Sequence, residues 1–512
     1  MHVLMVAAEN DALPNAKVGG VADVVRDCPK ALIEKGLTVD VVIPDYGFHY
    51  LERQHLGSIS VSFAGKIEQL EVWQLAQSEQ GIKQLVISHW EFSRHHGAVY
   101  CNDEIGRPFA TDASKFALFN AAVCEALLQG VINPPDVLHL HDWHSACVAL
   151  LLKTDKRFNR FSNLFLAYTV HNLALQGIRP FKGDSSSLEA WFPSLGYDGQ
   201  TLCDPRYPDC FNPMRTAINL VDKVHLVSPT YCQEVLKASD ADNGFFGGEG
   251  LEQDLQAANK EGRVVGILNG CEYSVAEPDN CTLASLYQHA ELALFQWMAK
   301  SPILDSTHYI AHQRLLQFKT RPFSGPLVTS VGRLTDQKAL LLRQPYNQHR
   351  VIDELCARLS TYHGYMIILG SGDDSLEQLM TAAMARNVNL LYLKGYAHLT
   401  GEYLYQLGDL FLMPSSFEPC GISQMLAMRA GQPCLVHSVG GLKDTVVDSE
   451  NGFSFEGANL SEQSSALINR FSEVLALRET DSELWCTICE RAKSARFTWQ
   501  QVATNYLSDL YQ

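Results

Sequence analysis

Residues 410–424 read Leu-Phe-Leu-Met-Pro-Ser-Ser-Phe-Glu-Pro-Cys-Gly-Ile-Ser-Gln, and this stretch decides the fold class. The apolar run Leu410–Met413 predicts a buried strand that ends in a turn, and the turn carries one carboxylate, Glu418. A helix with one apolar side is predicted from near Gly421. The strand Cys434–Val436 and a glycine pair that opens another helix come next. This succession is typical of an α/β domain with a parallel sheet.

The same segment suits a sugar phosphate as a ligand. Backbone N–H groups at the starts of the two helices can hold an anion. The Glu418 carboxylate beside them can accept hydrogen bonds from sugar hydroxyls. Two ordinary strand–turn–helix units would give the same pattern, so this segment alone leaves both interpretations open.

Apolar runs of strand length alternate with helical patterns on both sides of this segment. In the first half the predicted strands are Val3–Ala8, Val39–Ile43, Leu85–Ser88, Val137–Leu140, Leu164–Val170 and Val224–Val227, and the clearest helices are Val21–Glu34 and Ala113–Gln129. In the second half the further strands are Leu327–Val331, Met366–Leu369 and Leu390–Leu393, with helices at Val351–Leu359, Leu376–Ala385, Tyr403–Leu407 and Ile422–Ala430. Continuous apolar strands alternating with helices predict two doubly wound α/β domains with buried parallel sheets.

The chain, at 512 residues, exceeds the size of one hydrophobic core. The alternating pattern weakens between residues 271 and 325, where Leu283–Met298 looks helical and the remainder looks irregular. We therefore predict an N-terminal domain over 1–265, a hinge and insertion over 266–325, a second domain over 326–490 and a terminal helical segment over 491–512.

Composition excludes several classes of protein. Forty Lys and Arg against 57 Asp and Glu give a net charge of −17, which disfavours a nucleic-acid partner. The 14 cysteines are scattered along the chain, with no two-Cys, two-His zinc pattern, which is typical of buried thiols in a reducing cytoplasm. No apolar run approaches the ~18 residues that span a bilayer, and the N-terminus is interpreted as a strand, not a signal peptide.

In open parallel sheets, ligands bind beyond the carboxyl ends of the strands, and this rule selects the polar residues that directly follow strands. In the first domain they are Glu9, Lys17–Gly20, His141–His144, His171–Asn172 and Asn269–Gly270. In the second domain they are Gly332–Lys338, Gly370–Asp373, Gly395–Tyr396 and Glu418.

Two of these segments carry positive charge. Lys17, followed by Gly19 and Gly20, can bring a point charge and backbone donors to a phosphate, although a tight strand–helix turn explains the glycines equally well. The G-x-G-x-x-G spacing of a nicotinamide site is missing after the first strand. Arg333 and Lys338 can neutralise a leaving diphosphate, with a solvated charge pair as the alternative.

The histidine-rich segment after the fourth strand has a metal site as one interpretation, but His141 and His144 are too few ligands for one. Asp142 and Trp143 suit sugar recognition, while a helix-capping Asp is the simpler alternative. His171 is either a core histidine or a site residue, and its place at the end of a strand makes the two equally plausible.

Taken together, these residues resemble the bacterial glycogen synthase and plant starch synthase family. The matching segments occur in the family's order over nearly the whole chain. They are Lys17–Asp23, His141–His144, Thr169–Asn172, Val227–Tyr231, Asn269–Gly270, Gly332–Lys338, Phe417–Gly421, Gln424, Gly440–Gly441 and Phe497–Trp499.

The resemblance implies the GT-B fold, with two Rossmann-like domains that face each other across a cleft. The N-terminal domain would lie on the acceptor side, the C-terminal domain would hold the donor, and the terminal helix would cross back to the N-terminal domain. The implied reaction transfers glucose from ADP-glucose to the non-reducing end of an α-1,4-glucan such as glycogen, with retention of configuration. No metal or cofactor is implied, and the enzyme would be cytoplasmic.

The resemblance also implies roles for individual residues, with His171, Glu418, Arg333 and Lys338 as the catalytic set. The donor-binding residues would be Lys17, Gly19, Gly20, Arg333, Lys338, Tyr396, Cys420, Gly421, Ile422 and Ser423. The sugar or acceptor cleft would contain Glu9, Asp142, Trp143, Asn172 and Asn269. A retaining glycosidase uses two carboxylates ~5 Å apart. Glu418 is the only carboxylate in the strongest motif, so no covalent intermediate is expected.

Several positions depart from the family's pattern, among them the three that follow, Ala276 where tryptophan is common, and Ala311–Gln317. Ser416 stands where arginine is usual, Glu272 follows Asn269-Gly-Cys where the family has aspartate, and Arg215 replaces a lysine. These departures leave two alternatives open. One is an inactive or regulatory glucan-binding relative, and the other is a GT-B transferase that uses UDP-glucose or a small acceptor.

Overall fold

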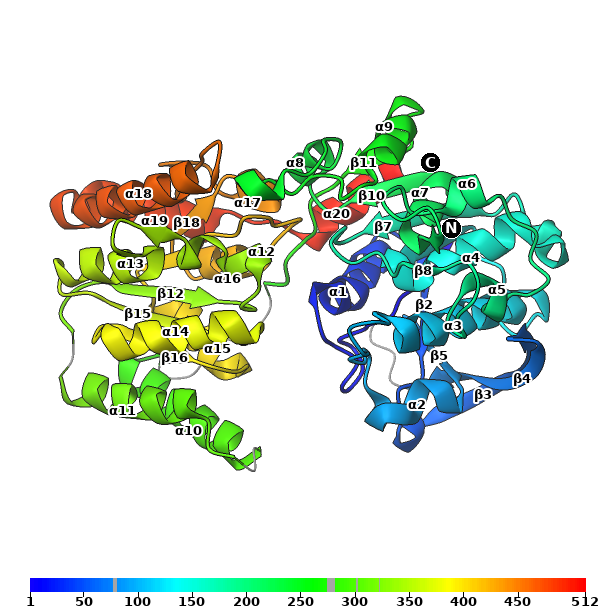
Figure 1. Cartoon of the computed structure of the whole chain (residues 1–512), viewed down its shortest axis with the longest axis horizontal. Coiled ribbons are helices and arrows are strands. Elements are labelled where there is room, and N and C mark those ends of the chain that lie inside the picture. Colours follow the sequence, from blue (N-terminus) through cyan, green and yellow to red (C-terminus); the bar gives the residue numbers. More distant parts are fainter. Residues whose placement is uncertain (77–80, 274–280, 301–302, 322) are drawn as a thin grey trace. The chain divides into compact units, whose positions relative to one another are not determined.

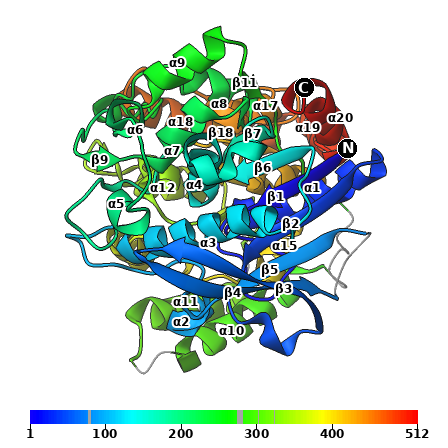
Figure 2. The same cartoon turned by 90° about the vertical axis from the view of Figure 1, so that its right-hand side faces the viewer.

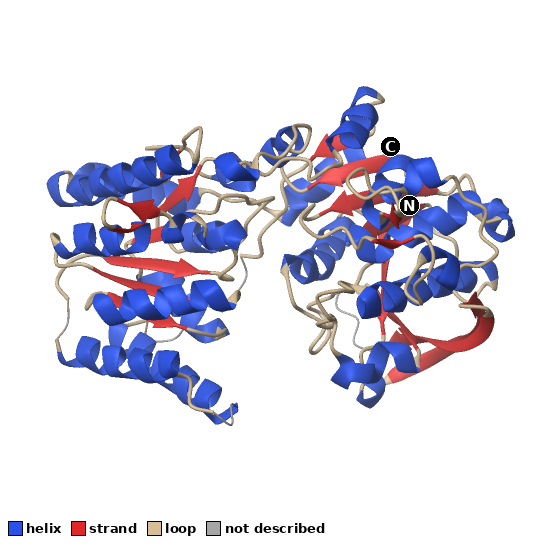
Figure 3. Cartoon of the chain, viewed as in Figure 1, coloured by secondary structure: helices blue, strands red, loops and turns tan. Residues whose placement is uncertain are grey.

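The computed structural model describes residues 1–76, 81–273, 281–300, 303–321 and 323–512, so parts of the predicted hinge and insertion lie outside the described residues. The chain forms two compact units, each built from a sheet and helices (Figures 1 and 3). The N-terminal unit contains Met1–Ser239, Gly247–Gly270 and Thr498–Gln512, and the C-terminal unit contains Asp240–Phe246 and Cys271–Phe497. The prediction of two doubly wound α/β domains is confirmed.

The sheet of the N-terminal unit has the strand order β11-β10-β7-β6-β1-β2-β5-β4-β3. All strands from β11 to β5 in this order run parallel. Their bounds are β1 (His2–Val6), β2 (Thr38–Pro44), β5 (Lys83–Ser88), β6 (Val137–His141), β7 (Phe165–Val170), β10 (Lys223–Leu226) and β11 (Val264–Gly266). The six strands predicted in this half are present within about two residues of their predicted ends, because helices cover both faces and keep the runs continuously apolar.

A hairpin at the edge of this sheet was not predicted. Strands β3 (Arg53–Phe63) and β4 (Lys66–Leu75) pair antiparallel through a two-residue turn. Both turn residues, Ala64 and Gly65, have positive φ angles of 51° and 73°. A two-residue turn of this kind matches the twist of a hairpin. The second half of β3 alternates between buried and exposed residues, and this period-two pattern was the available signal.

The helices of the N-terminal unit pack in two groups. α1 (Gly20–Glu34) contacts α20 (Trp499–Asn505), which continues as a wider turn over Tyr506–Leu510. α3 (Ala110–Leu128), α4 (Asp142–Thr154) and α7 (Pro213–Leu220) pack side by side, and α3 lies against β3 (Figure 2). The smaller elements are α2 (Trp90–Gly97), β8 (Arg179–Pro180), α5 (Leu188–Trp191), α6 (Gly199–Leu202), β9 (Cys210–Phe211), α8 (Pro229–Glu234) and α9 (Glu252–Lys260).

The sheet of the C-terminal unit has the all-parallel order β16-β15-β12-β17-β18-β19. Its strands are β12 (Leu327–Val331), β15 (Tyr365–Leu369), β16 (Leu390–Leu393), β17 (Leu410–Met413), β18 (Cys434–His437) and β19 (Phe453–Phe455). Its other elements are α12 (Asp336–Ala339), β13 (Pro345–Tyr346), β14 (His349–Arg350), α13 (Val351–Ser360), α14 (Asp374–Arg386), α15 (His398–Leu407), α16 (Ser423–Arg429), α17 (Gly440–Thr445), α18 (Leu460–Thr480) and α19 (Ser482–Ser494).

The expectation that the segment after Met298 is irregular is wrong for residues 306–320. Helices α10 (Leu283–Lys300) and α11 (Ser306–Thr320) pack together, and α11 lies along β16 at the edge of the sheet (Figure 1). A buried arginine blurs the amphipathic pattern of α11, because Arg314 donates hydrogen bonds to the carbonyl oxygens of Met384 and Val388. A buried polar side chain with backbone partners interrupts the apolar stripe without destabilising the helix.

Within the described parts of the chain, no helix combines the length and apolar composition that would be needed to cross a membrane.

Candidate active site

The carboxyl edge of the N-terminal sheet gathers polar side chains from four strands. Glu9 follows β1, Asp142 follows β6, His171 follows β7 and Asn269 follows β11. All four side chains are buried. We call these four residues the N-terminal cluster, and the topological rule that selected them from the sequence places them at one edge of the sheet.

Asp142 holds the ends of two neighbouring strands together. Its φ angle of +53° is uncommon for a residue with a side chain. Its Oδ1 atom accepts a 2.7 Å hydrogen bond from the backbone N–H of His171. Burial raises the pKa of the Asp142 carboxyl to about 7, against the opposing effect of backbone hydrogen bonds from His171 and Asn172. A carboxyl group with this pKa changes charge near neutral pH.

Replacing Asp142 by asparagine is expected to make the protein more stable above neutral pH. Because the folded carboxyl keeps its proton up to about pH 7 while the unfolded one releases it near 3.8, stability falls as pH rises through this window. The free energy of unfolding of Asp142→Asn relative to wild type should therefore increase by about 2 kcal/mol between about pH 5.5 and pH 8. Urea unfolding of both proteins at the two pH values measures this difference in the free energy of unfolding. A difference that is the same at both pH values would contradict the raised pKa of Asp142.

His171 is held by a second histidine. Its Nε2 atom lies 3.0 Å from Nδ1 of His141, and the two rings stack with centroids 5.3 Å apart. Burial lowers the pKa of both imidazoles well below the usual range, and neighbouring histidines add to the effect. A neutral imidazole can offer one hydrogen-bond donor or acceptor to a ligand. Asn269 offers another polar atom, because its Oδ1 is buried without a partner among the described residues.

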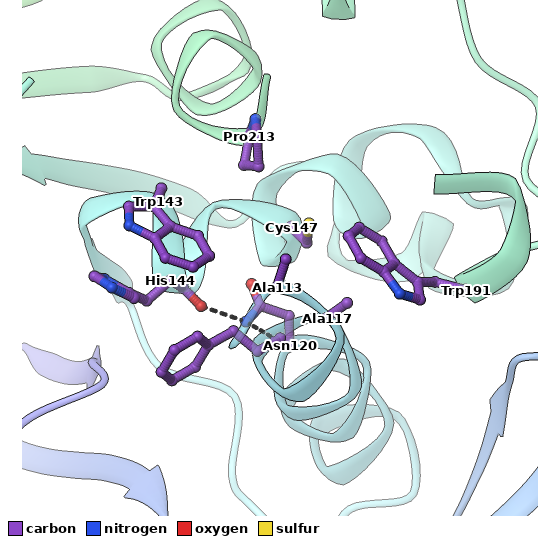
Figure 4. Close-up of a pocket in the computed structure, with 9 residues that line it drawn as sticks. Ala113, Ala117, Asn120, Trp143, His144, Cys147, Trp191 and Pro213 are labelled. Carbon is purple, nitrogen blue, oxygen red and sulfur yellow. Dashed lines mark hydrogen bonds between the residues drawn. The ribbon is translucent and has the colours of Figure 1, made fainter. Parts of the chain in front are cut away.

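Trp143 lies within the packing beneath the cluster. It is 5% exposed, and the rings of Phe109, Phe116 and His144 surround it. The cavity that it helps to line has a volume of about 10 Å³ (Figure 4). That volume is near the lower limit for one water molecule, so a sugar does not fit there. Asn172 also has a local role, because its Oδ1 accepts from the N–H of Ala174.

The Lys17 loop is occupied by internal partners. The Glu9 carboxylate accepts hydrogen bonds of 2.6 and 2.7 Å from the backbone N–H groups of Val18 and Gly19. Lys17 pairs with Asp11 and Asp23 at 3.2 and 2.6 Å. Burial alone would lower the pKa of Lys17, but these two carboxylates outweigh it and raise the pKa. Gly20 begins α1 directly after this loop.

The C-terminal unit joins two of the predicted residues directly. The Nζ atom of Lys338, on α12, lies 3.1 Å from Oε2 of Glu418, which follows β17. The Ser415 hydroxyl also lies 3.3 Å from the same carboxylate oxygen. Arg333 follows β12 with its side chain exposed, and among the described residues no ion pair or hydrogen bond engages its guanidinium. We call Arg333, Lys338, Ser415 and Glu418 the C-terminal cluster.

Two residues at this site were not predicted, Ser415 within the cluster and His437 next to it. The hydroxyl of Ser415 accompanies Glu418, and His437 at the end of β18 lies 3.0 Å from the Ser415 carbonyl oxygen through Nδ1. Burial lowers the pKa of His437 to about 4, so this imidazole is neutral. Ser415 lies in the segment 410–424, so the sequence could have indicated it. The contact of His437 with Ser415 depends on how the neighbouring strand β18 is placed, which no local pattern reports.

The glycine pair predicted to open a helix holds the Glu418 turn closely. The N–H of Gly441 donates to the backbone oxygen of Glu418 at 3.0 Å. A methyl group added at Gly441 would lie 2.2 Å from the carbonyl oxygen of Cys420. The backbone at residue 441 can lie this close to the backbone at Cys420 only because Gly441 has no side chain.

Gly441→Ala is therefore expected to displace the Glu418 turn. We expect a loss of about 1 to 3 kcal/mol in the free energy of unfolding, together with reduced catalytic turnover. Gly106→Ala is the matched control, because nothing lies within 4 Å of the added methyl. Differential scanning calorimetry compares the two variants, and equal thermal midpoints would contradict the close approach.

The remaining predicted donor residues lie around this turn. Cys420 is buried, Gly421 has a φ angle of +77°, Ile422 precedes α16 and Ser423 begins it. Tyr396 is 71% exposed, next to Gly395 at the end of β16. The structure thus brings Lys338 and Glu418 into contact and leaves Tyr396 open to solvent.

One of the departures has a local explanation in the structure. The backbone N–H of the buried Ser416 donates to the backbone oxygen of Gln337 at 2.9 Å and fixes α12 to the Glu418 turn, but any residue would supply this bond and nothing in the structure explains the serine. Arg215 pairs with Asp254 at 2.9 Å and donates to the backbone oxygens of Gln200 and Cys203. Arg215 therefore joins α7 to α9 and to α6.

Comparisons with known proteins cover the whole chain. The starch synthase catalytic domain family matches residues 2–257, and the glycosyl transferases group 1 family matches residues 316–482. The glycogen synthase of Streptococcus gordonii is 32% identical over 535 aligned positions, which cover 100% of this chain and 99% of that protein. The glycogen synthase of Lactiplantibacillus plantarum is 30% identical over 99% of this chain and 98% of its own length.

Solved structures give the same picture. The catalytic domain of starch synthase IV from Arabidopsis thaliana, bound to ADP and acarbose, superposes with a TM-score of 0.74 at 28% identity. The match covers 100% of this chain and 98% of that one. Sucrose-phosphate synthase from Thermosynechococcus elongatus, with a TM-score of 0.54 at 16% identity over 99% of this chain and 97% of that one, shares the fold.

Proposed function

The chain belongs to the glycogen and starch synthase family of GT-B glycosyltransferases, and on this premise we propose that it transfers glucose from ADP-glucose to the non-reducing end of an α-1,4-glucan. The anomeric configuration would be retained. The observation that carries the proposal is the contact of Lys338 with Glu418, with the exposed cation Arg333 in the segment that leads into α12, in a chain that matches glycogen synthases from end to end.

The two cations supply the main chemical contribution in this proposal. As the bond between glucose and the diphosphate breaks, negative charge accumulates on the leaving phosphate. Arg333 and Lys338 would stabilise that charge, which is the kind of electrostatic contribution that usually dominates such reactions. Because two positive charges are available, we propose that the donor needs no metal ion or other cofactor at this position.

Glu418 would act on the sugar and on Lys338 together. Its carboxylate is 5% exposed and neutralises Lys338 in the resting protein. When a diphosphate takes over the pairing with Lys338, the carboxylate becomes free to accept hydrogen bonds from the glucose hydroxyls. Positioning and charge stabilisation would then carry the rate, without a covalent glucosyl intermediate.

The N-terminal cluster would contribute neutral polar groups. The imidazole of His171 and the amide of Asn269 are suited to hydroxyl groups, since neither carries a charge that would have to be desolvated. We propose that they hold the transferred glucose or the acceptor end of the glucan. We propose that the reaction takes place in the cytoplasm, because its donor substrate is a nucleotide sugar.

Incubation with radiolabelled ADP-glucose and glycogen tests the function. Label in precipitated glycogen, with ADP released in equal amount, is the expected result. UDP-glucose in a parallel reaction separates the two donors, and label from UDP-glucose alone would assign a different donor. Glucan binding without ADP release, beside an active glycogen synthase as positive control, would identify an inactive glucan-binding relative instead.

A further inference from the structure

Three further buried histidines accompany His171 of the N-terminal cluster, and the proposed function uses only His171. His139 and His141 belong to β6, His225 belongs to β10 and His171 follows β7. Their exposed fractions are 0%, 1%, 0% and 8%, respectively. Such burial disfavours the charged imidazolium, so each ring has one N–H donor and one acceptor nitrogen.

The hydrogen bonds fix which nitrogen of His225 carries the hydrogen. Nε2 of His225 lies 2.9 Å from the carbonyl oxygen of Ile267, which can only accept. Nε2 is therefore the donor, and Nδ1 of His225 must accept. Two hydroxyls face that Nδ1, Thr169 at 3.0 Å and Tyr506 at 3.3 Å, and the shorter contact assigns the hydrogen bond to Thr169, which has a single hydrogen to donate.

The same reasoning continues to the end of the chain. Because the Thr169 hydroxyl donates its hydrogen to His225, the Thr169 oxygen accepts a hydrogen bond from Nε2 of His139, 2.7 Å away. Nδ1 of His139 then accepts from the hydroxyl of Tyr511 at 2.9 Å. The donors run in one direction, from Tyr511 through His139, Thr169 and His225 to Ile267, and we call this series of five residues the histidine relay.

The ring hydrogens of the stacked pair His141 and His171 can be assigned as well. His141 stacks on His139 with ring centroids 4.4 Å apart, and its Nδ1 shares one hydrogen with Nε2 of His171. Nε2 of His141 is buried without a partner among the described residues. An orphaned buried N–H is rarer than an under-satisfied acceptor, so the hydrogen of His141 belongs on Nδ1. His171 then accepts through Nε2 and keeps an Nδ1–H donor for a ligand.

The relay begins in the last residues of the chain. Tyr511 and Tyr506 are 5% and 0% exposed, and both pack edge-on against His139 at centroid distances of 5.6 and 5.7 Å. The Tyr506 hydroxyl also lies 3.3 Å from Nδ1 of His225. All of these residues belong to the N-terminal unit.

We propose that the histidine relay, which begins at Tyr511 and is set by Thr169, holds the stacked His141 and His171 rings so that His171 presents an N–H donor to the sugar. Thr169 and Tyr511 are positioning residues in this account, because they act through His139 and His141. The link to the sugar rests on the proposed function of the N-terminal cluster.

Three variants separate this role from simple packing. Thr169→Val keeps the shape of the side chain and removes the hydroxyl. The ring hydrogen of His139 should then move from Nε2 to Nδ1, which donates to the Tyr511 hydroxyl oxygen. Tyr511→Phe removes the first donor. We expect kcat/KM to fall by about tenfold in Thr169→Val and by at least about threefold in Tyr511→Phe. Thr169→Ser, which restores the hydroxyl, should stay within about threefold of wild type.

Thr329→Val is the matched control. Thr329 is a fully buried strand threonine of the C-terminal unit, and its hydroxyl accepts from Gln432 at 2.7 Å. This variant should lose thermal stability to a similar extent while keeping kcat/KM within about threefold. If packing alone mattered at residue 169, Thr169→Val would resemble wild type and Thr169→Ser would be the impaired variant, and that order would overturn the proposal.

Neutron diffraction from crystals of the deuterated full-length protein reads the hydrogens directly. The expected deuterons lie on Nε2 of His139 and His225 and on Nδ1 of His171 in the wild type, and on Nδ1 of His139 in Thr169→Val. A deuteron on Nε2 of His171, or on Nδ1 of His139 in the wild type, would overturn the proposal. These positions do not depend on the donor substrate, so a protein inactive with ADP-glucose would refute the proposed function and leave the relay to be decided by diffraction.

Discussion

Lys338→Ala is expected to lower kcat for glucose transfer by about 10²- to 10³-fold while the protein remains folded. The Nζ atom of Lys338 is 3.1 Å from Glu418, and in the proposed reaction it would receive the phosphate charge that develops as the glycosyl bond breaks. An alanine at this position supplies no positive charge. Water that replaces the side chain stabilises the phosphate charge poorly inside a partly buried site. Initial rates at saturating ADP-glucose and glycogen measure the loss.

Lys319→Ala is the matched control for this variant. Lys319 makes an ion pair of similar length, 2.8 Å, with Glu291 between α11 and α10, outside the C-terminal cluster. Surface pairs of this kind contribute little, so the control should retain nearly all of its activity. A Lys338→Ala enzyme with more than about a tenth of the wild-type kcat would contradict the role assigned to Lys338.

Glu418→Gln is expected to lower kcat by about 10²-fold, although it hardly changes the volume of the side chain. The amide keeps one oxygen for the Ser415 hydroxyl but loses the negative charge that pairs with Lys338. It also loses an acceptor for the glucose hydroxyls in the proposed complex. The same kinetic assay, run with Glu291→Gln as the control, separates this effect from a general change of charge.

A double variant tests whether the two residues act as a unit. If Lys338 and Glu418 depend on each other, the loss in Lys338→Ala/Glu418→Ala should be much smaller than the product of the two single losses. Losses that multiply would show that the two side chains act independently, against the shared role proposed for them.

Much of the fold was predictable from the sequence because the strands are buried on both faces. β1 and β15, for example, are almost continuously buried, and their apolar runs stand out without any alignment. The β3–β4 hairpin was missed because it lies at the edge of the sheet, where only period-two alternation marks a strand. Helix α11 was missed because Arg314 and His308 are buried in it with backbone partners.

The candidate site was predictable as far as strand ends define it. Lys338 and Glu418 were selected because each follows a strand, and parallel neighbours bring such residues together. The capture of the Val18 and Gly19 N–H groups by Glu9 was not predicted, because it depends on the path of a loop. The contact of Tyr511 with His139 joins residues 372 positions apart, and no local pattern reports such a pair.

The central claim is that the cations of the C-terminal cluster hold the diphosphate of the donor. A crystal structure of the full-length protein with ADP tests it most directly. The account predicts phosphate oxygens within hydrogen-bonding distance of both the Arg333 guanidinium and the Lys338 ammonium group. ADP bound elsewhere, with Lys338 still paired to Glu418 and Arg333 facing solvent, would contradict it.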